Sequence, residues 1–295
     1  MAFPALPQSW QLRSRSLELP HHNSSLQRPL VMGIVNVTPD SFSDGGRHTT
    51  VEQAVQHGLK LVADGADVLD VGGESTRPYS SPVPLDEELR RVNDVVRCLA
   101  AESGVPVSVD TSKASVAIRA LEHGAEIIND VTGLEGDPDM ISVARESGAG
   151  ICAMHMQGTP QTMQDNPSYD DVVADVHAYL LARRDNLVRH GIALEKICLD
   201  PGIGFGKTHA HNRELMAHAE RFLNLGTPIL IGHSRKGFIG KTIKNALGRK
   251  GTQDEIDTAT AQAACGLAAA GIQIVRVHDV GRVRAALAMS ATMQI

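Results

Sequence analysis

The chain has 295 residues, of which 42% are hydrophobic and 21% are charged, proportions that are typical of a globular protein and exclude global disorder. It carries 28 Lys and Arg against 34 Asp and Glu, so its formal net charge is −6 and it lacks the basic surplus that binds nucleic acids or anionic membranes. Only 3% of the residues are aromatic, too few for a base-stacking platform. We therefore expect no nucleic acid and no membrane as a partner.

Residues 1–29 contain four prolines and show no clear structural period, so we predict an N-terminal extension laid against the rest of the chain. This segment has no uninterrupted apolar stretch, which argues against a signal peptide. The longest uncharged stretch, residues 258–275, is too polar to span a bilayer. The four cysteines are widely spaced and form no C-x-x-C pair, which indicates reduced thiols and a cytoplasmic location.

From residue 30 onward, short apolar runs alternate with segments of helical period. The apolar runs cover residues 30–37, 68–71, 105–109, 126–131, 150–154, 197–199, 228–231 and 272–277. The helical segments cover residues 50–65, 85–101, 112–123, 139–146, 170–190, 212–223, 258–270 and 282–292, with a long connection at 247–257. Near-continuous apolar runs suit parallel strands that are covered on both faces. Eight such alternations predict an α/β fold, a (β/α)8 barrel in which residues 30–295 form a single domain; a doubly wound open sheet is the alternative.

Polar residues follow every apolar run, at the strand ends where barrels of this kind carry their active sites. The first polar residues are Asn36, Asp70, Asp110, Asn129, His155, Asp200, His233 and Arg276, the last followed by His278. Helix capping or turn formation explains Glu74, Thr111 and Ser112 equally well. It explains poorly the four polar residues within or beside the most apolar runs, which are Asn129, Asp200, Arg276 and His278. Burying such groups is costly unless a partner or a ligand compensates them.

Two glycine-containing stretches lie among these strand ends. The stretch 200–208 resembles a nucleotide-binding P-loop, but Pro201 stands where a P-loop needs glycine, so that interpretation fails. Its glycines at 202, 204 and 206 still let the backbone approach a flat ligand closely. The stretch 234–237 opens a helix, whose N-terminus favours an anion. By contrast, we expect His155 to be a hydrogen-bonded residue near the core and the pair at 21–22 to be solvated.

The residue types indicate the chemistry of the ligand. The carboxylates and the amide, Asp110, Asn129 and Asp200, suit a planar edge rich in hydrogen-bond donors, as in a guanine-like ring. The cations Arg77, Lys236, Arg276 and His278 suit phosphate or pyrophosphate. With Asn36 as an oxygen ligand, a Mg²⁺ that keeps most of its waters can bridge to the phosphates. These residues predict a barrel enzyme that joins a heterocycle-containing diphosphate to a second molecule.

Eight stretches carry these residues together with their neighbours. They are 32–46 (MGIVNVTPDSFSDGG), 67–78 (DVLDVGGESTRP), 107–113 (VSVDTSK), 127–133 (IINDVTG), 154–158 (MHMQG), 200–208 (DPGIGFGKT), 232–236 (GHSRK) and 276–279 (RVHD). In this order they resemble the motifs of the dihydropteroate synthases, across about residues 30–280. The resemblance implies a transferase that condenses 6-hydroxymethyl-7,8-dihydropterin diphosphate with 4-aminobenzoate, giving 7,8-dihydropteroate and pyrophosphate in folate synthesis.

The resemblance also implies roles for individual residues. The pterin would be held by Asp110, Asn129, Asp200 and Lys236, with Met154 lining its pocket. Arg276 would lie against the ring and, with His278 and Asn36, bind the diphosphate and Mg²⁺. A loop carrying Thr76, Arg77 and Pro78 would close over the site together with residues 36–46. Phe205 and Ser234 would shape the aminobenzoate slot. A homodimer is likewise implied by the resemblance alone.

The expected reaction places developing negative charge on the leaving diphosphate, which Arg276, His278, Lys236 and Arg77 are suited to stabilise. The amine is already neutral at pH 7 and needs positioning more than deprotonation, so we predict no single essential general base. The chain departs from many relatives at Gly237, where they have a serine whose hydroxyl can meet the aminobenzoate carboxylate.

Two alternatives remain at this point. A pterin-binding methyltransferase barrel would keep the pterin carboxylates but has no need of the stretches 75–77 and 234–236. A catalytically silent pterin-binding paralogue would have lost some of Asn36, Arg77, Lys236 or His278, and none is missing.

Overall fold

The computed structural model describes residues 6–20, 28–37 and 47–293. Its largest sheet has eight parallel strands, in the spatial order β8-β7-β6-β5-β4-β3-β10-β9. The strands are β3 (Leu30–Asn36), β4 (Val68–Gly72), β5 (Val107–Asp110), β6 (Ile127–Asp130), β7 (Gly150–Met154), β8 (Ile197–Asp200), β9 (Leu230–Ile231) and β10 (Ile274–Val277). A parallel bridge between Leu199 of β8 and Ile229, which directly precedes β9, joins the first and last strands of this order. The sheet is therefore closed, which confirms the (β/α)8 barrel and excludes the open sheet.

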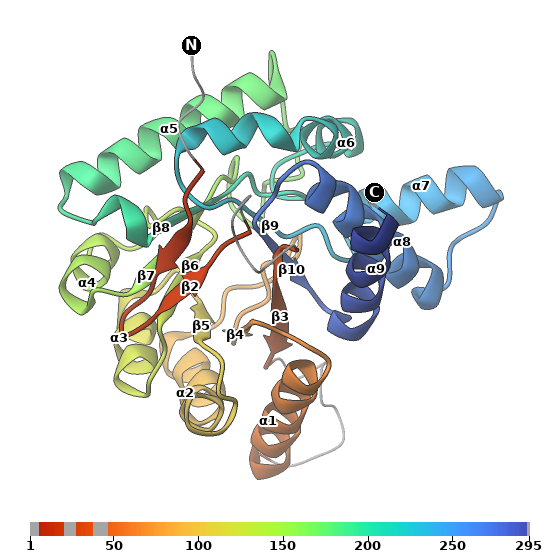
Figure 1. The fold of residues 1–295 in the computed structure, drawn as a ribbon. Coiled ribbons are helices and arrows are strands. Elements are labelled where there is room, and N and C mark those ends of the chain that lie inside the picture. Colours follow the sequence, from red (N-terminus) through yellow and green to blue (C-terminus); the bar gives the residue numbers. More distant parts are fainter. Residues whose placement is uncertain (1–5, 21–27, 38–46, 294–295) are drawn as a thin grey trace.

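Helices surround the ring of strands (Figure 1). They are α1 (Arg47–Ala63), α2 (Leu85–Glu102), α3 (Ala114–Glu122), α4 (Met140–Ser147), α5 (Val172–Arg189), α6 (His209–Ala217), α7 (Gly237–Leu247), α8 (Gln253–Ala269) and α9 (Val280–Met293). In the described part of the chain, no helix is both long and apolar enough to cross a membrane.

Two predicted helices have different bounds in the structure. The predicted helix 212–223 is divided into α6 and a 3-10 helix, Ala219–Leu225. The predicted start at 258 is wrong, because α8 begins at Gln253 and most of the supposed connection 247–257 is helical. Thr252 caps α8: its hydroxyl accepts the Glu255 N–H, and Glu255 accepts the Thr252 N–H in return. This first turn is polar, so it gives no apolar period by which to detect it.

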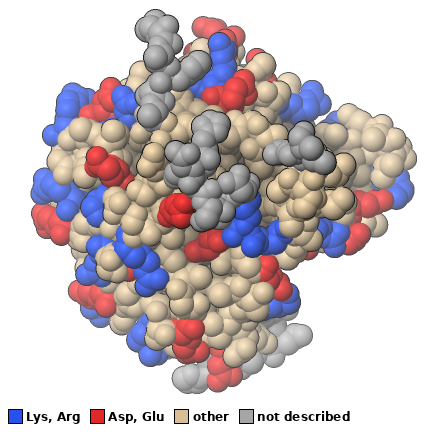
Figure 2. Space-filling view, in the orientation of Figure 1, with Lys and Arg blue, Asp and Glu red and all other residues tan. Residues whose placement is uncertain are grey.

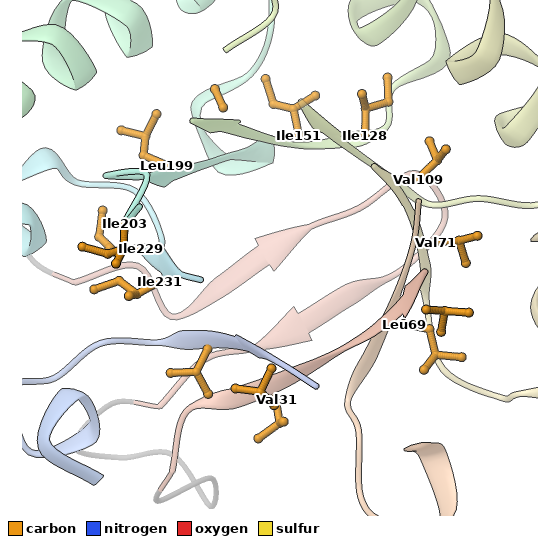
Figure 3. Packing of buried hydrophobic residues seen from close by; sticks show 14 of the residues in the cluster. Val31, Leu69, Val71, Val109, Ile128, Ile151, Leu199, Ile203, Ile229 and Ile231 are labelled. Carbon is orange, nitrogen blue, oxygen red and sulfur yellow. The ribbon is translucent and has the colours of Figure 1, made fainter. Parts of the chain in front are cut away.

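The strands bury alternate side chains on opposite sides of the ring. One set packs outward against the helices, in a large cluster that also includes Ile203 of the loop after β8. Figure 3 labels ten residues of this cluster around the ring: Val31, Leu69, Val71, Val109, Ile128, Ile151, Leu199, Ile203, Ile229 and Ile231. The other set fills the barrel interior and includes Leu30, Met32, Val68, Ile127, Cys152, Cys198, Leu230 and Ile274. Both faces of each strand are therefore buried, as the near-continuous apolar runs predicted.

A short antiparallel hairpin, β1 (Ser9–Gln11) and β2 (Ser16–Glu18), closes one end of the barrel. Figure 1 looks onto this end, with the hairpin in front of the ring. Trp10 is fully buried within the interior cluster, and its indole N–H donates to the Lys196 carbonyl at 3.0 Å. The described part of the N-terminal segment thus lies against the barrel, and it contains two three-residue strands that the sequence pattern did not reveal. Acidic and basic side chains are mixed over this face (Figure 2).

Candidate active site

The inward-facing positions of the strands change from apolar to polar along the barrel axis. Positions two apart on a strand share a face. In β4 and β10, Val68 and Ile274 belong to the apolar interior, and Asp70 and Arg276 follow two residues later. On three other strands, Asn129, Met154 and Asp200 likewise stand two positions after a residue of the apolar interior. The strands therefore gather the predicted residues at their C-terminal ends.

Arg276 is at the centre of the polar end. Its Nε donates to Asp70 Oδ2 at 2.6 Å, and its Nη2 donates to Asp110 Oδ2 at 2.7 Å. The Asn129 amide donates to the same Asp70 oxygen at 3.0 Å. These side chains come from four different strands. Their burial is therefore compensated by one another before any ligand binds.

Asp70 is the member of this network to which the sequence assigned no role. It is fully buried, and its second oxygen, Oδ1, has no hydrogen-bond partner in the described residues. The two-residue step from the apolar layer could have identified it, because Asp70 stands two positions after the inward-facing Val68. Its contacts show that it orients Arg276 and Asn129.

The environment of the two predicted pterin carboxylates favours their neutral forms. Burial raises the pKa of Asp110 to about 7, against the opposing attraction of Arg276. Burial also raises the pKa of Asp200 to about 6, although the Gly202 N–H donates to its Oδ1 at 2.7 Å. The pKa of Arg276 is raised, because the attraction of Asp70 and Asp110 outweighs its burial. The cation is thus permanent, whereas the carboxyls can change protonation state near neutral pH.

An apolar wall stands beside these carboxylates. Phe205 packs in a small buried cluster with Met154 and Met163. The Lys236 Nζ lies 3.9 Å from the centroid of the Phe205 ring, a cation–π contact. Burial and the nearby Arg276 lower the pKa of Lys236 to about 8. A flat ring placed here would have an apolar surface on one side and charged groups at its edge.

Two glycines of the stretch 200–208, Gly202 and Gly206, make room for other parts of the protein. A Cβ on Gly202, whose φ is +70°, would lie 1.9 Å from the His155 carbonyl oxygen. A Cβ on Gly206 would lie 2.4 Å from the Gln157 carbonyl oxygen. This close packing accounts for glycine at both positions without a ligand, whereas Gly204 lines the cavity, and close approach of a flat ligand there stays a prediction. Gly202 and Gly206 let this loop pack directly on the loop that follows β7.

Lys207, in the stretch 200–208, is a buried residue. Only 2% of its surface is exposed, and its ammonium meets His155 Nδ1 and the Phe205 carbonyl, each at 2.9 Å. Burial lowers the pKa of Lys207 to about 7, and burial with the neighbouring Lys207 lowers that of His155 to about 3. His155 is therefore the neutral acceptor, which confirms it as a hydrogen-bonded residue near the core. Lys207 fixes the loop that carries Phe205.

The stretch 234–237 opens helix α7, as predicted. The Ser234 hydroxyl lies 3.0 Å from His278 Nδ1 and accepts the His278 backbone N–H at 3.2 Å. Burial and nearby cations, Arg235 first, lower the pKa of His278 to about 3, so it is a neutral imidazole here and not the cation counted from the sequence. Arg235 is likewise not a free cation. Its guanidinium makes two hydrogen bonds to Asp257 of α8, at 2.7 and 2.9 Å.

A cavity of 1430 Å³ lies over this end of the barrel. Nine predicted site residues line it: Asn36, Thr76, Arg77, Pro78, Asp110, Ser234, Lys236, Arg276 and His278. The other four, Asn129, Met154, Asp200 and Phe205, are buried and belong to the layer beneath. Thr76, Arg77 and Pro78 come from the loop between β4 and α2, where Arg77 is exposed. The predicted loop 36–46 lies outside the described residues after position 37.

The donors available to a metal ion are few. The described residues contain no group of three or more His, Cys, Asp or Glu side chains arranged to hold a metal. Asn36 ends β3 and lines the cavity, so its amide oxygen offers one protein ligand. Mg²⁺ commonly keeps several waters and takes one or two protein groups together with substrate phosphates. The site therefore fits a Mg²⁺ that arrives with a diphosphate.

Comparison with known proteins agrees with this geometry. A family model described as "Pterin binding enzyme" matches residues 32–278. The dihydropteroate synthase of Escherichia coli (strain K12) is 45% identical over 257 residues, which cover 86% of this chain and 88% of that protein. A solved structure of Xanthomonas albilineans dihydropteroate synthase with 4-aminobenzoic acid has a TM-score of 0.87 at 43% identity, covering 98% and 99% of the two chains. Another, in complex with 7,8-dihydropteroate, has a TM-score of 0.83 at 41% identity, covering 97% and 99%.

Proposed function

This chain belongs to the pterin-binding enzyme family and catalyses the dihydropteroate synthase reaction, and on that premise we propose which residues of the barrel mouth carry it. The enzyme is a transferase that condenses 6-hydroxymethyl-7,8-dihydropterin diphosphate with 4-aminobenzoate. In this reaction the C–O bond to the diphosphate breaks, the diphosphate leaves with the electron pair, and the amine nitrogen bonds to the same carbon and then releases one proton to water or to the departing diphosphate. The products are 7,8-dihydropteroate and pyrophosphate.

The pterin is held at the bottom of the cavity by Asp110, Asn129, Asp200 and Lys236. The donor-rich edge of the ring meets the buried carboxylates, while Lys236 and the wall of Phe205 and Met154 bound the ring. The raised pKa values of Asp110 and Asp200 support this assignment, because N–H donors of the ring would compensate the carboxylate charges that burial disfavours.

The diphosphate lies against Arg276, with His278 and Arg77 nearby. In the free protein the charge of Arg276 is already balanced by Asp70 and Asp110. A diphosphate therefore needs further positive charge, which the exposed Arg77 can bring and which Mg²⁺ on Asn36 would supply when bound. Arg276 is held by two carboxylates before the reaction begins, so it needs no reorganisation as charge develops on the leaving oxygens. His278, neutral in the free protein, acts as a hydrogen-bond donor.

The aminobenzoate enters above the pterin carbon that loses diphosphate. Ser234 and the N-terminus of α7, together with Phe205, form one side of its slot, and Thr76, Arg77 and Pro78 form the other. The backbone N–H groups at the start of α7 and the cation Arg77 suit a carboxylate. Because the amine is neutral at pH 7, the site acts by orienting it, with no essential general base.

One observation carries these assignments: Arg276 is fixed between Asp70 and Asp110 at the floor of a cavity whose other walls supply Lys236 and Arg77. The test is an assay for dihydropteroate from pterin diphosphate and 4-aminobenzoate, with and without Mg²⁺. We expect turnover that depends on Mg²⁺. A silent paralogue or a methyltransferase would give no turnover, and full activity in the presence of a chelator would remove Mg²⁺ from the proposal.

We also propose that the enzyme is a cytoplasmic homodimer. The four cysteines are unpaired, which fits a reducing compartment. Leu247 at the end of α7 and Met289 and Met293 in α9 are large exposed apolar side chains that a second copy would cover. Sedimentation velocity at assay concentrations tests the dimer, and a fully active monomer would contradict it.

A further inference from the structure

The loop between β4 and α2 has both of its ends tied to one carboxylate. Glu74, at the start of the loop, accepts the backbone N–H of Val83, near its end, on Oε1 at 3.1 Å. The other oxygen of Glu74 accepts a hydrogen bond from the ammonium of Lys113. Lys113 stands directly before α3, so a residue of a different βα unit completes this closure. We call Glu74, Val83 and Lys113 the neck of the loop.

Lys113 is itself held by a buried carboxylate. Its ammonium donates to Glu88 Oε2 at 2.5 Å, and Glu88, in α2, is fully buried. The Thr111 hydroxyl donates to the other Glu88 oxygen at 2.7 Å. Burial alone would lower the pKa of Lys113, but its hydrogen bonds to Glu74 and Glu88 outweigh this and raise it. The ammonium therefore remains charged and bridges two carboxylates.

The part of the loop beyond the neck is tied to the loop after β7, where Asp165 accepts the Tyr79 hydroxyl at 3.2 Å and the Gln161 amide donates to the Ser80 carbonyl at 3.2 Å. Tyr79 N–H donates to the Pro160 carbonyl at 3.0 Å, and Ser80 N–H donates to the Arg77 carbonyl at 3.1 Å. The Arg77 guanidinium has no hydrogen-bond partner within the ranges that the structure describes, although Arg77 N–H contacts Ser75 Oγ at 3.4 Å. The position of the Arg77 side chain thus depends on the neck together with these contacts to the loop after β7.

We propose that Glu74 and Lys113 are positioning residues, which close the neck and so hold the segment 76–78 over the aminobenzoate slot. This rests on the proposed role of Arg77 in the reaction. A closed neck removes conformations in which the segment 76–78 points away from the slot. The loop therefore loses less conformational entropy when 4-aminobenzoate binds. It also explains why the motifs at 67–78 and 107–113 end in Glu-Ser-Thr-Arg-Pro and in Lys. Neither Glu74 nor Lys113 caps a helix with its side chain. Glu74 also lines the cavity, whereas Lys113 does not.

The decisive variant is Glu74→Gln, because it leaves the buried pair of Lys113 and Glu88 intact and so preserves the fold. Lys113→Met is the companion, and Lys113→Arg keeps the charge. Arg90→Gln is the matched control, since Arg90 pairs with Glu87 on the exposed surface of the same helix α2. Hydrogen exchange of residues 75–83 and the KM values of both substrates are measured for each.

Glu74→Gln and Lys113→Met should speed exchange of residues 75–83 by about tenfold and raise the KM for 4-aminobenzoate by about 5- to 20-fold. The KM for the pterin diphosphate should rise by less than the KM for 4-aminobenzoate, because Arg276 still holds the diphosphate when Arg77 is displaced. Lys113→Arg should restore most of both properties, and Arg90→Gln should change neither. Wild-type exchange in Glu74→Gln and Lys113→Met would overturn the proposal.

Arg77→Ala separates this inference from the proposed function. A raised aminobenzoate KM in Arg77→Ala, with an unchanged KM in Glu74→Gln despite faster exchange, would overturn the positioning role alone. A wild-type KM in Arg77→Ala would instead overturn the role of Arg77, and faster exchange in Glu74→Gln would still support the closed neck.

Discussion

The two ends of the barrel interior are built from the same strands and yet have opposite physical character. At the end closed by the hairpin, the inward positions are occupied by Met32, Val68, Ile127 and their neighbours, and Trp10 packs against them. At the other end, two residues further along several of the strands, the inward positions carry Asp70, Asn129, Asp200 and Arg276. The alternation of the strands fixes both sets, because each of these four polar residues follows an inward-facing apolar one.

The difference shows how one fold separates stability from chemistry. Burial of the apolar end stabilises the protein by roughly 25 cal/mol per Å² of surface removed from water. Burial of the polar end acts against stability, since it raises the pKa of Asp110 and of Asp200 and leaves Asp70 Oδ1 without a partner in the described part of the chain. Substitutions at the apolar end can thus lower the stability of the protein without altering the site. Substitutions at the polar end can raise its stability at the expense of activity.

The largest effect is expected at the closed end, from Trp10→Ala. Removing a fully buried indole should lower the free energy of unfolding by about 3–5 kcal/mol and leave the Lys196 carbonyl without its donor. Because the site is at the opposite end, kcat and both KM values should stay at wild-type levels well below the melting temperature. Urea unfolding and steady-state kinetics check this. Trp10→Phe is the control and should recover most of the stability; a loss of kcat in the folded Trp10→Ala protein would contradict the separation.

The polar end should show the reverse pattern in Arg276→Ala. Losing this cation should lower kcat/KM by about a hundredfold to a thousandfold, because the leaving diphosphate loses a preorganised donor. It also leaves Asp70 and Asp110 unpaired, so the pKa of Asp110 should rise further. Lys60→Ala, which removes a cation of an exposed pair on α1, is the control and should have wild-type activity. Wild-type turnover in Arg276→Ala would mean that the leaving group is held elsewhere.

Asp200→Asn should weaken pterin binding by about 10- to 100-fold and also stabilise the ligand-free protein at high pH. The folded pKa of Asp200, about 6, is raised above the value of about 3.9 expected in the unfolded chain. The stabilising contribution of Asp200 is therefore fully present below about pH 4, and up to about 3 kcal/mol of it is lost as the pH rises from about 4 through the folded pKa of about 6. The asparagine cannot ionise and avoids this loss.

The measurement that tests Asp200→Asn is urea unfolding without ligand at pH 4 and pH 8, with pterin binding by calorimetry at pH 8. The variant and the wild type should be equally stable at pH 4, and the variant more stable at pH 8. Asp137→Asn, at a surface turn before α4, is a control that should lack this gain. Unchanged pterin affinity in Asp200→Asn would contradict its role in binding.

Most of the barrel could be predicted because its strands are buried on both faces and so read as apolar runs. The hairpin could not, since Ser9–Gln11 and Ser16–Glu18 are too short and too polar to show a period, and only Trp10 is fully buried. The first turn of α8 was missed for a similar reason. Its start is fixed by the capping box of Thr252 and Glu255, which is local and independent of any apolar stripe.

The site was predictable at its strand ends but not in its contacts. Parallel strands bring their ends together, so the positions of Asp110, Asn129, Asp200 and Arg276 followed from the topology. The pairing of Arg276 with Asp70 depends on the directions that their side chains take inside the barrel, at the same distance along its axis. The burial of Lys207 depends on a loop packed against the loop after β7. Such contacts join residues remote in sequence and leave no local pattern.

The smallest expected effect concerns the departure at Gly237, the first residue of α7, where many relatives have a serine. A Cβ at this position would lie 3.3 Å from Cε1 of His209, whose side chain is exposed and can shift by a few tenths of an ångström. Gly237→Ser should therefore be tolerated, and its hydroxyl should lower the KM for 4-aminobenzoate by about two- to fivefold, the size of one solvent-accessible hydrogen bond.

Gly240→Ser, one turn further along α7, is the matched control for Gly237→Ser. Its Cβ would meet nothing within 4 Å, so it gains the same helix propensity away from the cavity. Equal shifts of KM in the two variants would assign the effect to the helix and not to the hydroxyl. A rise in KM in Gly237→Ser would mean that His209 cannot move, so that crowding at the slot outweighs the added donor. A KM that falls in Gly237→Ser and is unchanged in Gly240→Ser would show that the polar end, unlike the apolar one, depends on individual atoms more than on the area buried.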